Sequence, residues 1–293
     1  MPRPVVVGLD GSDESVAAAR WGAGEAVRRG LPLCLLHADE GLPTDASTLP
    51  ELEAPRLRAR DIVRGATDDL AGRCPHLHPT VRLVARPAAE ALLTVGAEAE
   101  LLVLGSQAFG AVGGLMAGSV AMSVVAHATR PVVLVRAGQR AEDVPHGAGP
   151  GGVPAGAPHV VVGVDTLQPC DDVLSFAFES ASLRSAALEV VRTWRPGHGH
   201  APEARAGVTS REDVERGLAA ALRPWREKYP GVAVRATVGD GRPAENLSRA
   251  AADACLLVVG RRTRPERLGM HIGPVAHAVI QDVPCPVAVV PHA

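Results

Sequence analysis

The chain has 293 residues, a formal net charge of −2, and a composition that is 46% hydrophobic but only 2% aromatic. Its length suits two domains of ordinary size, and its near-neutral charge excludes a general electrostatic attraction to nucleic acid. No apolar run reaches the roughly 18 residues of a membrane-spanning helix. The five cysteines are scattered without a C-x-x-C pair, which argues against a disulfide framework. We therefore expect a cytoplasmic protein with neither nucleic-acid nor membrane partners.

Short apolar runs alternate with longer amphipathic segments through the first half of the chain. The apolar runs are rich in Val and Leu, which is typical of parallel strands buried on both faces. In chain order we expect strand Val5–Leu9, helix Asp13–Arg29, strand Leu33–His37, helix Glu51–Leu70, strand Val81–Val84, helix Ala88–Ala97, strand Leu101–Leu104, helix Ser119–Ala128 and strand Val132–Val135.

The second half repeats this alternation after a stretch rich in Gly and Pro. Its predicted strands are Val160–Val164, Leu188–Thr193, Val232–Val238, Leu256–Val259 and Val287–Val290. Strands that alternate with helices predict an α/β fold with a parallel sheet and right-handed crossovers. We expect one domain at residues 1–138, a linker at 139–158 and a second domain at 159–293.

Several short motifs recur at a constant spacing of 155 residues, which indicates an internal duplication. The strand-end motif Val7-Gly8-Leu9-Asp10 returns as Val162-Gly163-Val164-Asp165. The glycines at 105 and 118 return at 260 and 273. Each copy therefore combines a strand that ends in Gly-x-Asp with a glycine-rich segment that leads into a helix.

The position of the strand-end aspartate suggests two roles. In a doubly wound sheet of order 3-2-1-4-5, the carboxyl ends of strands one and four flank the point where ligands bind. Asp10 would then accept hydrogen bonds from a ribose or a base. Alternatively, Asp10 shapes the turn before the helix, which Ser12 and Asp13 would begin. The sequence leaves both roles open.

The glycine-rich segment after the fourth strand predicts a phosphate site. It opens with Gly105-Ser106-Gln107-Ala108 and closes with Gly118-Ser119-Val120 at a helix start. Glycine lets the backbone approach phosphate oxygens closely, and the free N–H groups of a helix N-terminus favour an anion. The Ser119 hydroxyl would add one more donor.

These residues resemble the universal stress protein family. Its ATP-binding members carry the pattern G-2x-G-9x-G followed by Ser or Thr after strand four, and Gly105, Ala108, Gly118 and Ser119 fall on the marked positions. The resemblance covers both halves and leaves out only the linker. It implies two tandem Rossmann-like domains of the adenine nucleotide alpha hydrolase type. It also implies that the aspartate turn and the end of strand two hold adenosine while the glycine segment holds the phosphates.

The same resemblance gives the expected ligand and the residues that hold it. The ligand would be ATP, or ADP or AMP, with or without Mg²⁺. The chain would form a homodimer and would also bind an unidentified protein partner. The implied binding residues are Gly8, Asp10, Gly11, Ser12, His37, Gly105, Ser106, Gln107, Ala108, Gly118, Ser119 and Val120 in the first copy and Gly163, Asp165, Gly260, Arg261, Arg262, Gly273 and Val275 in the second.

Departures from the family pattern rank the first copy as the better nucleotide site. Ala108 replaces one glycine there, while the second copy has Thr263 at that position and Pro274 in place of the Ser or Thr. Proline removes an N–H and a hydroxyl that would face the phosphates. Arg261 and Arg262 could compensate by binding phosphate, or they could belong to a solvated basic loop or pair with carboxylates of the other domain.

The sequence favours a stress-response regulator that binds nucleotide over an efficient enzyme. It contains no Walker lysine motif and no catalytic triad motif, so we expect no catalytic residues and at most a weak ATPase. One alternative is a nucleotide-free, dimerising interaction module of the same family. A second alternative is an adenine-nucleotide hydrolase. The histidine pairs at 76 and 78 and at 198 and 200 lack further ligands at suitable spacing, so we expect no metal site.

Overall fold

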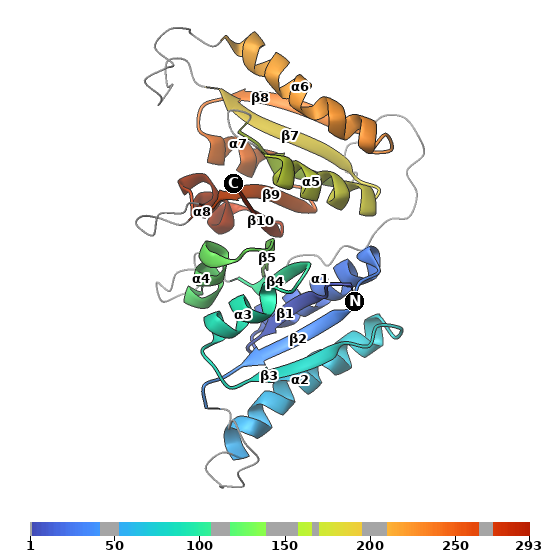
Figure 1. The fold of residues 1–293 in the computed structure, drawn as a ribbon, viewed down its shortest axis with the longest axis vertical. Helices are drawn as coiled ribbons and strands as arrows, with labels where there is room; N and C mark the ends of the chain where they lie inside the picture. The colour runs from blue at the N-terminus through green and yellow to red at the C-terminus, as the bar shows by residue number, and fades with distance from the viewer. Residues whose placement is uncertain are drawn as a thin grey trace. The chain divides into compact units, whose positions relative to one another are not determined.

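A computed structural model of the chain describes residues 2–41, 53–106, 118–138, 158–165, 170–194, 210–263 and 272–293. The chain divides into two compact units, Met1–Asp143 and Val144–Ala293. Figure 1 shows their helices and strands, coloured along the sequence. The two units are described in turn below.

The first unit is a parallel sheet with helices packed on it. Its strands follow the order β3-β2-β1-β4-β5, and each printed pairing between neighbours is parallel. Helix α1 contacts α2, and α3 contacts α4. The elements are β1 (Val5–Leu9), α1 (Asp13–Arg29), β2 (Leu33–Ala38), α2 (Glu53–Arg73), β3 (Thr80–Val84), α3 (Ala88–Gly96), β4 (Leu101–Gly105), α4 (Ser119–His127) and β5 (Val132–Val135).

Local sequence signals account for the elements that lead to the site. The side chains of β1, β2 and β4 are almost all buried, as expected for central parallel strands covered on both faces. Helix α1 begins after Ser12, whose hydroxyl accepts a hydrogen bond from the Ser15 N–H, and it ends at Gly30 in the left-handed conformation (φ 62°). Asp13 and Glu14 in its first turn complement the helix dipole.

The second unit repeats this architecture. Its strands follow the order β8-β7-β6-β9-β10, again with parallel pairing. Both sheets thus have the predicted order, in which the first strand of each copy lies between the second and the fourth. The elements are β6 (His159–Gly163), α5 (Asp171–Leu183), β7 (Ala187–Trp194), α6 (Arg211–Lys228), β8 (Val234–Asp240), α7 (Pro243–Ala250), β9 (Leu256–Arg262), α8 (Pro274–Asp282) and β10 (Val287–His292).

The start of β8 lies two residues after the predicted one. Val232 was expected to begin a strand, but β8 begins at Val234. Val232 instead lies in the turn after α6, where its N–H donates to the Tyr229 carbonyl at 3.1 Å and its side chain is buried. Its apolar character reflects packing of that turn. The other strands agree with the prediction to within three residues at either end.

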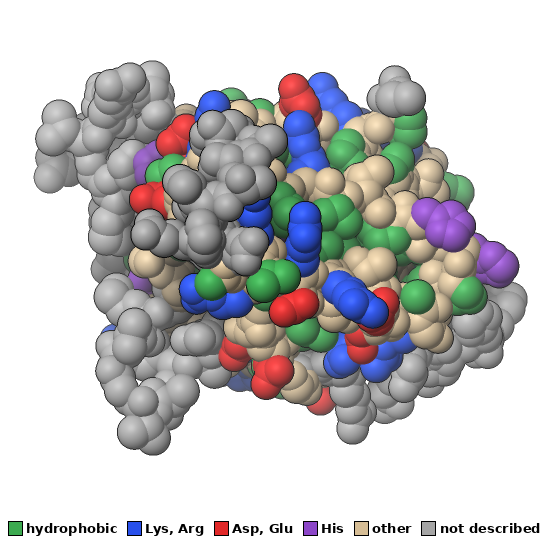
Figure 2. Space-filling model, turned by 90° about the horizontal axis from the view of Figure 1, so that it is seen from below, with side chains coloured by type: hydrophobic (Ala, Val, Ile, Leu, Met, Phe, Trp, Pro, Cys, Tyr) green, Lys and Arg blue, Asp and Glu red, His purple; other side chains and the backbone are tan. Residues whose placement is uncertain are grey.

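Strand β3 lies at one end of the first unit's sheet and is largely exposed. Val81 and Leu83, two residues apart on the strand, keep 46% and 45% of their surface accessible. On the face drawn in Figure 2, hydrophobic side chains lie among acidic and basic ones. Among the described residues, acidic and basic side chains are therefore intermixed on that face.

Candidate functional site

The structure brings the Asp10 turn and the end of β4 together at one edge of the first unit's sheet. Strand β1 pairs with β2 on one side and with β4 on the other, so the strand order reverses at the boundary between β1 and β4. Gly105, the last residue of β4, lies against Glu14 and Ser15 in the first turn of α1. The helix that follows the Asp10 turn therefore packs directly on the strand that leads into the glycine-rich segment.

The Asp10 side chain shapes the turn between β1 and α1. Its Oδ1 accepts hydrogen bonds from the Ser12 N–H at 2.9 Å and from the Ser12 hydroxyl at 2.5 Å. Gly11 between them has φ +87°, a conformation that favours glycine. Burial alone would raise the pKa of the Asp10 carboxyl, but the hydrogen bonds from Ser12 and Ser15 outweigh it and hold that pKa below its ordinary value. The turn role foreseen for Asp10 is thus observed, and its ionised carboxylate lies exposed at the site.

His37 ties the ends of two strands together. It pairs in register with Leu9, and its Nδ1 lies 2.9 Å from the Leu9 carbonyl oxygen. Because a carbonyl can only accept, Nδ1 carries the proton of this bond. The ring is buried, with 7% of its surface accessible. Through this hydrogen bond, His37 of β2 holds the end of β1 in place at the edge of the sheet where a ligand would lie.

Ser106 follows β4 and holds a buried hydroxyl. Its backbone N–H donates to the Val135 carbonyl at 2.8 Å, which fixes the residue beside β5. The side chain is 2% accessible, and its Oγ makes no hydrogen bond in the part of the chain described here. Buried hydroxyls in proteins are usually paired, so this one is an unusual feature of the site.

Helix α4 begins at the other end of the glycine-rich segment. Gly118 precedes its first residue and provides no side-chain cap. Ser119 and Val120 are exposed, and a Cβ at Gly118 would meet nothing within 4 Å. Gly118 thus offers no side-chain acceptor to the first N–H groups of α4. The predicted site residues Gln107 and Ala108 lie outside the described residues.

The second copy is built differently at the same edge. Asp165, which follows β6, lies near two arginines. Its Oδ2 is 3.3 Å from Nη2 of Arg262 and its Oδ1 is 3.8 Å from Nη1 of Arg192. Arg192 stands 155 residues after His37, and Arg262 stands 155 residues after Gln107. Arg262, for which three roles were left open, thus pairs with a carboxylate of its own unit.

Two further predicted residues of the second copy are explained by packing. Gly163 in β6 lies against α7, where a Cβ would meet Leu247 at 3.0 Å. Gly260 in β9 lies against His292, where a Cβ would meet the ring at 2.6 Å. Arg261 is 6% accessible, and burial lowers the pKa of its guanidinium. Gly163 and Gly260 therefore serve close contacts whatever else they do.

The start of α8 lacks some of the donors found in α4. Gly273 caps the helix without a side-chain hydrogen bond, and Pro274 is its first residue, which has no N–H to donate. Val275 follows in the first turn and is partly exposed. This end of the second copy is therefore poorer in donors than its counterpart at Ser119.

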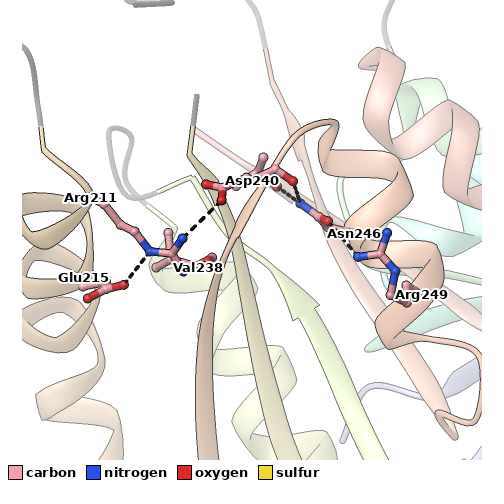
Figure 3. A network of polar contacts seen from close by, with 7 residues as sticks. Arg211, Glu215, Val238, Asp240, Asn246 and Arg249 are labelled. Carbon is pink, nitrogen blue, oxygen red and sulfur yellow. Dashed lines mark hydrogen bonds and ion pairs between the residues drawn. The ribbon is translucent and has the colours of Figure 1, made fainter. Parts of the chain in front are cut away.

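A polar network in the second unit orders the neighbouring ends of β7 and β8 (Figure 3). Arg211 at the start of α6 donates to the Val238 carbonyl at 2.7 Å and to Asp240 at 3.2 Å. The Asn246 amide of α7 donates to the Asp240 carbonyl at 3.0 Å and to Thr193 Oγ1 at 3.2 Å. The network joins two helices to two strands beside the Asp165 position.

Sequence reasoning missed Arg192 and the Asn246 network. The spacing of 155 residues places Arg192 at the position of His37, and this signal could have identified it. Asn246 corresponds to Ala91 in the first copy, so the repeat gives no clue to its role. Among the described residues, no group of three or more His, Cys, Asp or Glu side chains could hold a metal ion. No described helix is long and apolar enough to cross a membrane.

Comparisons with known proteins agree with the duplicated fold. The profile of the Universal stress protein family matches residues 1–136 and 157–291. A universal stress protein of Mycobacterium tuberculosis is 32% identical, over 97% of this chain and 96% of its own. One from Mycolicibacterium smegmatis is 31% identical, over 98% of this chain and 96% of its own. The crystal structure of a universal stress protein from Archaeoglobus fulgidus covers 99% of this chain and 98% of its own, with a TM-score of 0.70 and 16% identity. The resemblance is confirmed, and the chain belongs to the universal stress protein family.

Proposed function

We propose that the first half of this protein binds an adenine nucleotide, ATP or its products ADP and AMP, between the Asp10 turn and the segment from Gly105 to Ser119. The observation that carries the proposal is the buried Ser106 hydroxyl, which has no partner among the described residues. Leaving a buried hydroxyl unpaired costs about 1–3 kcal/mol. A ligand oxygen at this position would offset that cost, whereas a protein without a ligand would gain nothing from the serine.

The beginning of α4 supports a phosphate at the same place. Among the described residues its first-turn N–H groups receive no side-chain cap from Gly118, and the exposed Ser119 hydroxyl lies in the same turn. The Asp10 carboxylate at the opposite side of the edge remains ionised and exposed. Phosphates would therefore lie toward α4 and the ribose or base toward the Asp10 turn, with Mg²⁺ accompanying ATP.

We propose regulation by binding, with slow hydrolysis at most. Lys228 is the only lysine of the chain, and it lies in α6 of the second unit near the rings of Trp225 and Tyr229. The first half thus has no lysine that could stabilise charge developing on a transferred phosphoryl group. Nucleotide occupancy would then act by changing which partner the protein binds.

The decisive experiment titrates the full-length protein with ATP, ADP and AMP by calorimetry. Gly118→Asp places a carboxylate where the phosphates would lie, and we expect it to weaken ATP binding by about tenfold or more. Gly72→Asp in the last turn of α2 is the matched control, because its Cβ would also meet nothing within 4 Å. Unchanged ATP affinity in Gly118→Asp would contradict the proposal. Mass spectrometry of any nucleotide that co-purifies would identify the natural ligand.

The domain boundaries and the assembly also remain proposals. We propose domains at residues 1–138 and 159–293, joined by a linker at 139–158 that contains the division between Asp143 and Val144. Expression of each half alone, followed by thermal melting, tests these limits. Light scattering of the full-length protein tests the proposed homodimer, and affinity capture with and without ATP tests for a protein partner.

A further inference from the structure

Strand β3 forms a free edge of the first unit's sheet (Figure 1). It pairs with β2 on one side, where the Asp39 N–H donates to the Val84 carbonyl at 3.1 Å. Because successive residues of a strand direct their backbone groups to opposite sides, Val81 and Leu83 direct their N–H and C=O groups away from β2. Neither residue forms a further hydrogen bond within the described part of the chain. Backbone donors and acceptors without a protein partner therefore line this edge.

The corresponding strand of the second unit, β8, has its outward carbonyls bound by side chains. Ala233, just before β8, directs its carbonyl to β7, so Val238 and Asp240 direct theirs away from β7. The Val238 carbonyl accepts a hydrogen bond from Arg211 at 2.7 Å, and the Asp240 carbonyl accepts one from Asn246 at 3.0 Å. Helices α6 and α7 thus block one edge of the second sheet, whereas the edge at β3 is left open.

The side chains of the open edge differ between the two faces of β3. Val81 and Leu83 lie on one face, with 46% and 45% of their surface accessible. Arg82 lies between them in sequence and on the other face, where it is exposed. No carboxylate among the described residues forms an ion pair with its guanidinium. The edge is therefore aliphatic on one face and positively charged on the other.

The charge of Arg82 decides which strand fits this edge. An antiparallel β3 from a second copy that engaged both outward residues would pair Val81 with Leu83, and this register sets Arg82 opposite itself. Like charges directly opposite one another destabilise a strand pair, so the edge disfavours its own copy. A strand with a carboxylate at that position would instead form an ion pair with Arg82. Aliphatic residues on either side of the carboxylate would cover Val81 and Leu83.

We propose that the β3 edge binds an extended acidic segment of another protein, which adds to the sheet as an antiparallel strand. The segment has a carboxylate opposite Arg82 and aliphatic residues opposite Val81 and Leu83. Hydrogen bonds to the outward backbone groups supply affinity, and the side chains supply selectivity. The inference does not depend on the nucleotide proposal, because it uses none of the residues assigned to that site.

Binding of labelled peptides to the full-length protein, followed by fluorescence polarisation, tests the choice of partner. The first peptide is Ser-Thr-Val-Glu-Val-Thr-Ser, and the second has Lys in place of Glu. The unmodified protein should bind the Glu peptide more tightly. Arg82→Glu should weaken binding of the Glu peptide about fivefold and strengthen binding of the Lys peptide by a similar factor. Arg223→Glu is the matched control, because it makes the same charge change at an exposed position of α6.

A second variant tests the backbone pairing. Val81→Pro removes an outward N–H but none of the hydrogen bonds between β3 and β2, so it should weaken binding of the Glu peptide about fivefold. Hydrogen exchange at the Val81 and Leu83 amides should slow when the peptide binds. Thermal melting shows whether Val81→Pro is folded. Should it fail to fold, the charge reversal at Arg82 still tests the proposal.

Each outcome has a definite meaning. A preference for the Glu peptide that inverts in Arg82→Glu but persists in Arg223→Glu would support the proposal. An equal effect of the two Arg→Glu changes would overturn it, since general charge would then explain both. Absence of binding of the Glu peptide at millimolar concentration would overturn it as well. Self-association in sedimentation that Val81→Pro abolishes would identify a second copy of the chain as the occupant, which would also overturn the acidic partner.

Discussion

Gly105 lies so close to Glu14 that a Cβ at position 105 would stand 2.7 Å from the Glu14 carbonyl carbon. Because that atom belongs to the helix backbone, a side chain at 105 could be accommodated only by moving α1. We expect Gly105→Ala to destabilise the first unit by about 1–3 kcal/mol, the usual cost of overpacking. The measurement is the urea midpoint of the first unit's unfolding.

Gly65→Ala provides the matched control for that change. Gly65 lies within α2, and its Cβ would meet nothing within 4 Å. Alanine there should stabilise the helix by about 0.5–1 kcal/mol. If Gly105→Ala raised the midpoint, as Gly65→Ala should, the close contact between Gly105 and α1 would be refuted.

Ser106→Ala should separate stability from ligand binding. Removing a buried hydroxyl that has no partner among the described residues should leave the nucleotide-free protein as stable as before or more stable, by up to about 1 kcal/mol. The same change should weaken ATP binding by about three- to tenfold, since it removes one hydrogen bond. Thermal melting without ligand and calorimetry with ATP measure the two effects.

Ser15→Ala is the comparison for Ser106→Ala. The Ser15 hydroxyl is buried and donates to the Ser12 carbonyl at 2.8 Å, so its loss should cost about 1 kcal/mol. An equal loss of stability in Ser106→Ala would mean that its hydroxyl is already paired in the free protein.

The ion pair between Arg20 and Asp69 should make the stability of the first unit depend on pH. Arg20 of α1 binds both carboxylate oxygens of Asp69 in α2, at 2.7 and 2.8 Å. Hydrogen bonding from Arg20 holds the pKa of Asp69 below its ordinary value of 3.8. A lowered pKa in the folded state means that the stabilisation is complete above this value and is lost as the pH falls through the folded-state pKa.

Asp69→Asn should therefore lower the urea midpoint at pH 6 and converge with the unmodified protein as the pH falls below 3.8. Asp68→Asn is the matched control, because Asp68 pairs with Arg64 at 3.7 Å and both side chains are highly exposed. It should have little effect at any pH. A pH-independent difference for Asp69→Asn would show that the ionised pair contributes nothing.

Asn246 should be coupled to Gly239 across the network of Figure 3. A Cβ at Gly239 would stand 2.7 Å from the Asn246 amide nitrogen, so Gly239→Ala should displace the amide from its bonds to Thr193 and Asp240. We expect Gly239→Ala and Asn246→Ala each to destabilise the second unit by about 1–2 kcal/mol. In the double variant the losses should overlap by about 1 kcal/mol, since both remove the same hydrogen bonds. Strict additivity in urea unfolding would contradict the contact.

Much of the fold followed from the sequence because its strands are buried on both faces and read as continuous Val and Leu runs. The duplication then gave the same strand order twice. Val232 made the predicted start of β8 too early, because buried turns and buried strands both favour apolar side chains. Strand β9 continues through Arg261 and Arg262, which pair with β10. Charged residues do not indicate a strand, so the sequence did not predict this extension.

The site was harder to predict because its contacts depend on register between strands. The sequence left two roles open for Asp10, one in the turn and one in ligand binding. The hydrogen bonds that Asp10 accepts from Ser12 became visible only in the structure. Arg192 escaped notice because arginines are frequent in this chain, and its meaning comes from lying beside Asp165 across two strands. Ligand contacts of the residues named from the family resemblance remain predictions.

The close packing of Gly105 has a counterpart in Gly260, which lies against His292 and Val173. The contacts of Gly105 are with helix backbone, so selection for folding alone would keep glycine there, even in a descendant that had lost every ligand; those of Gly260 are with side chains. A genomic survey that counts the first glycine of the pattern as a sign of ATP binding would therefore overcount. The residues at the helix start, Gly118 and Ser119 here against Gly273 and Pro274, are the ones whose variation should follow gain and loss of the ligand.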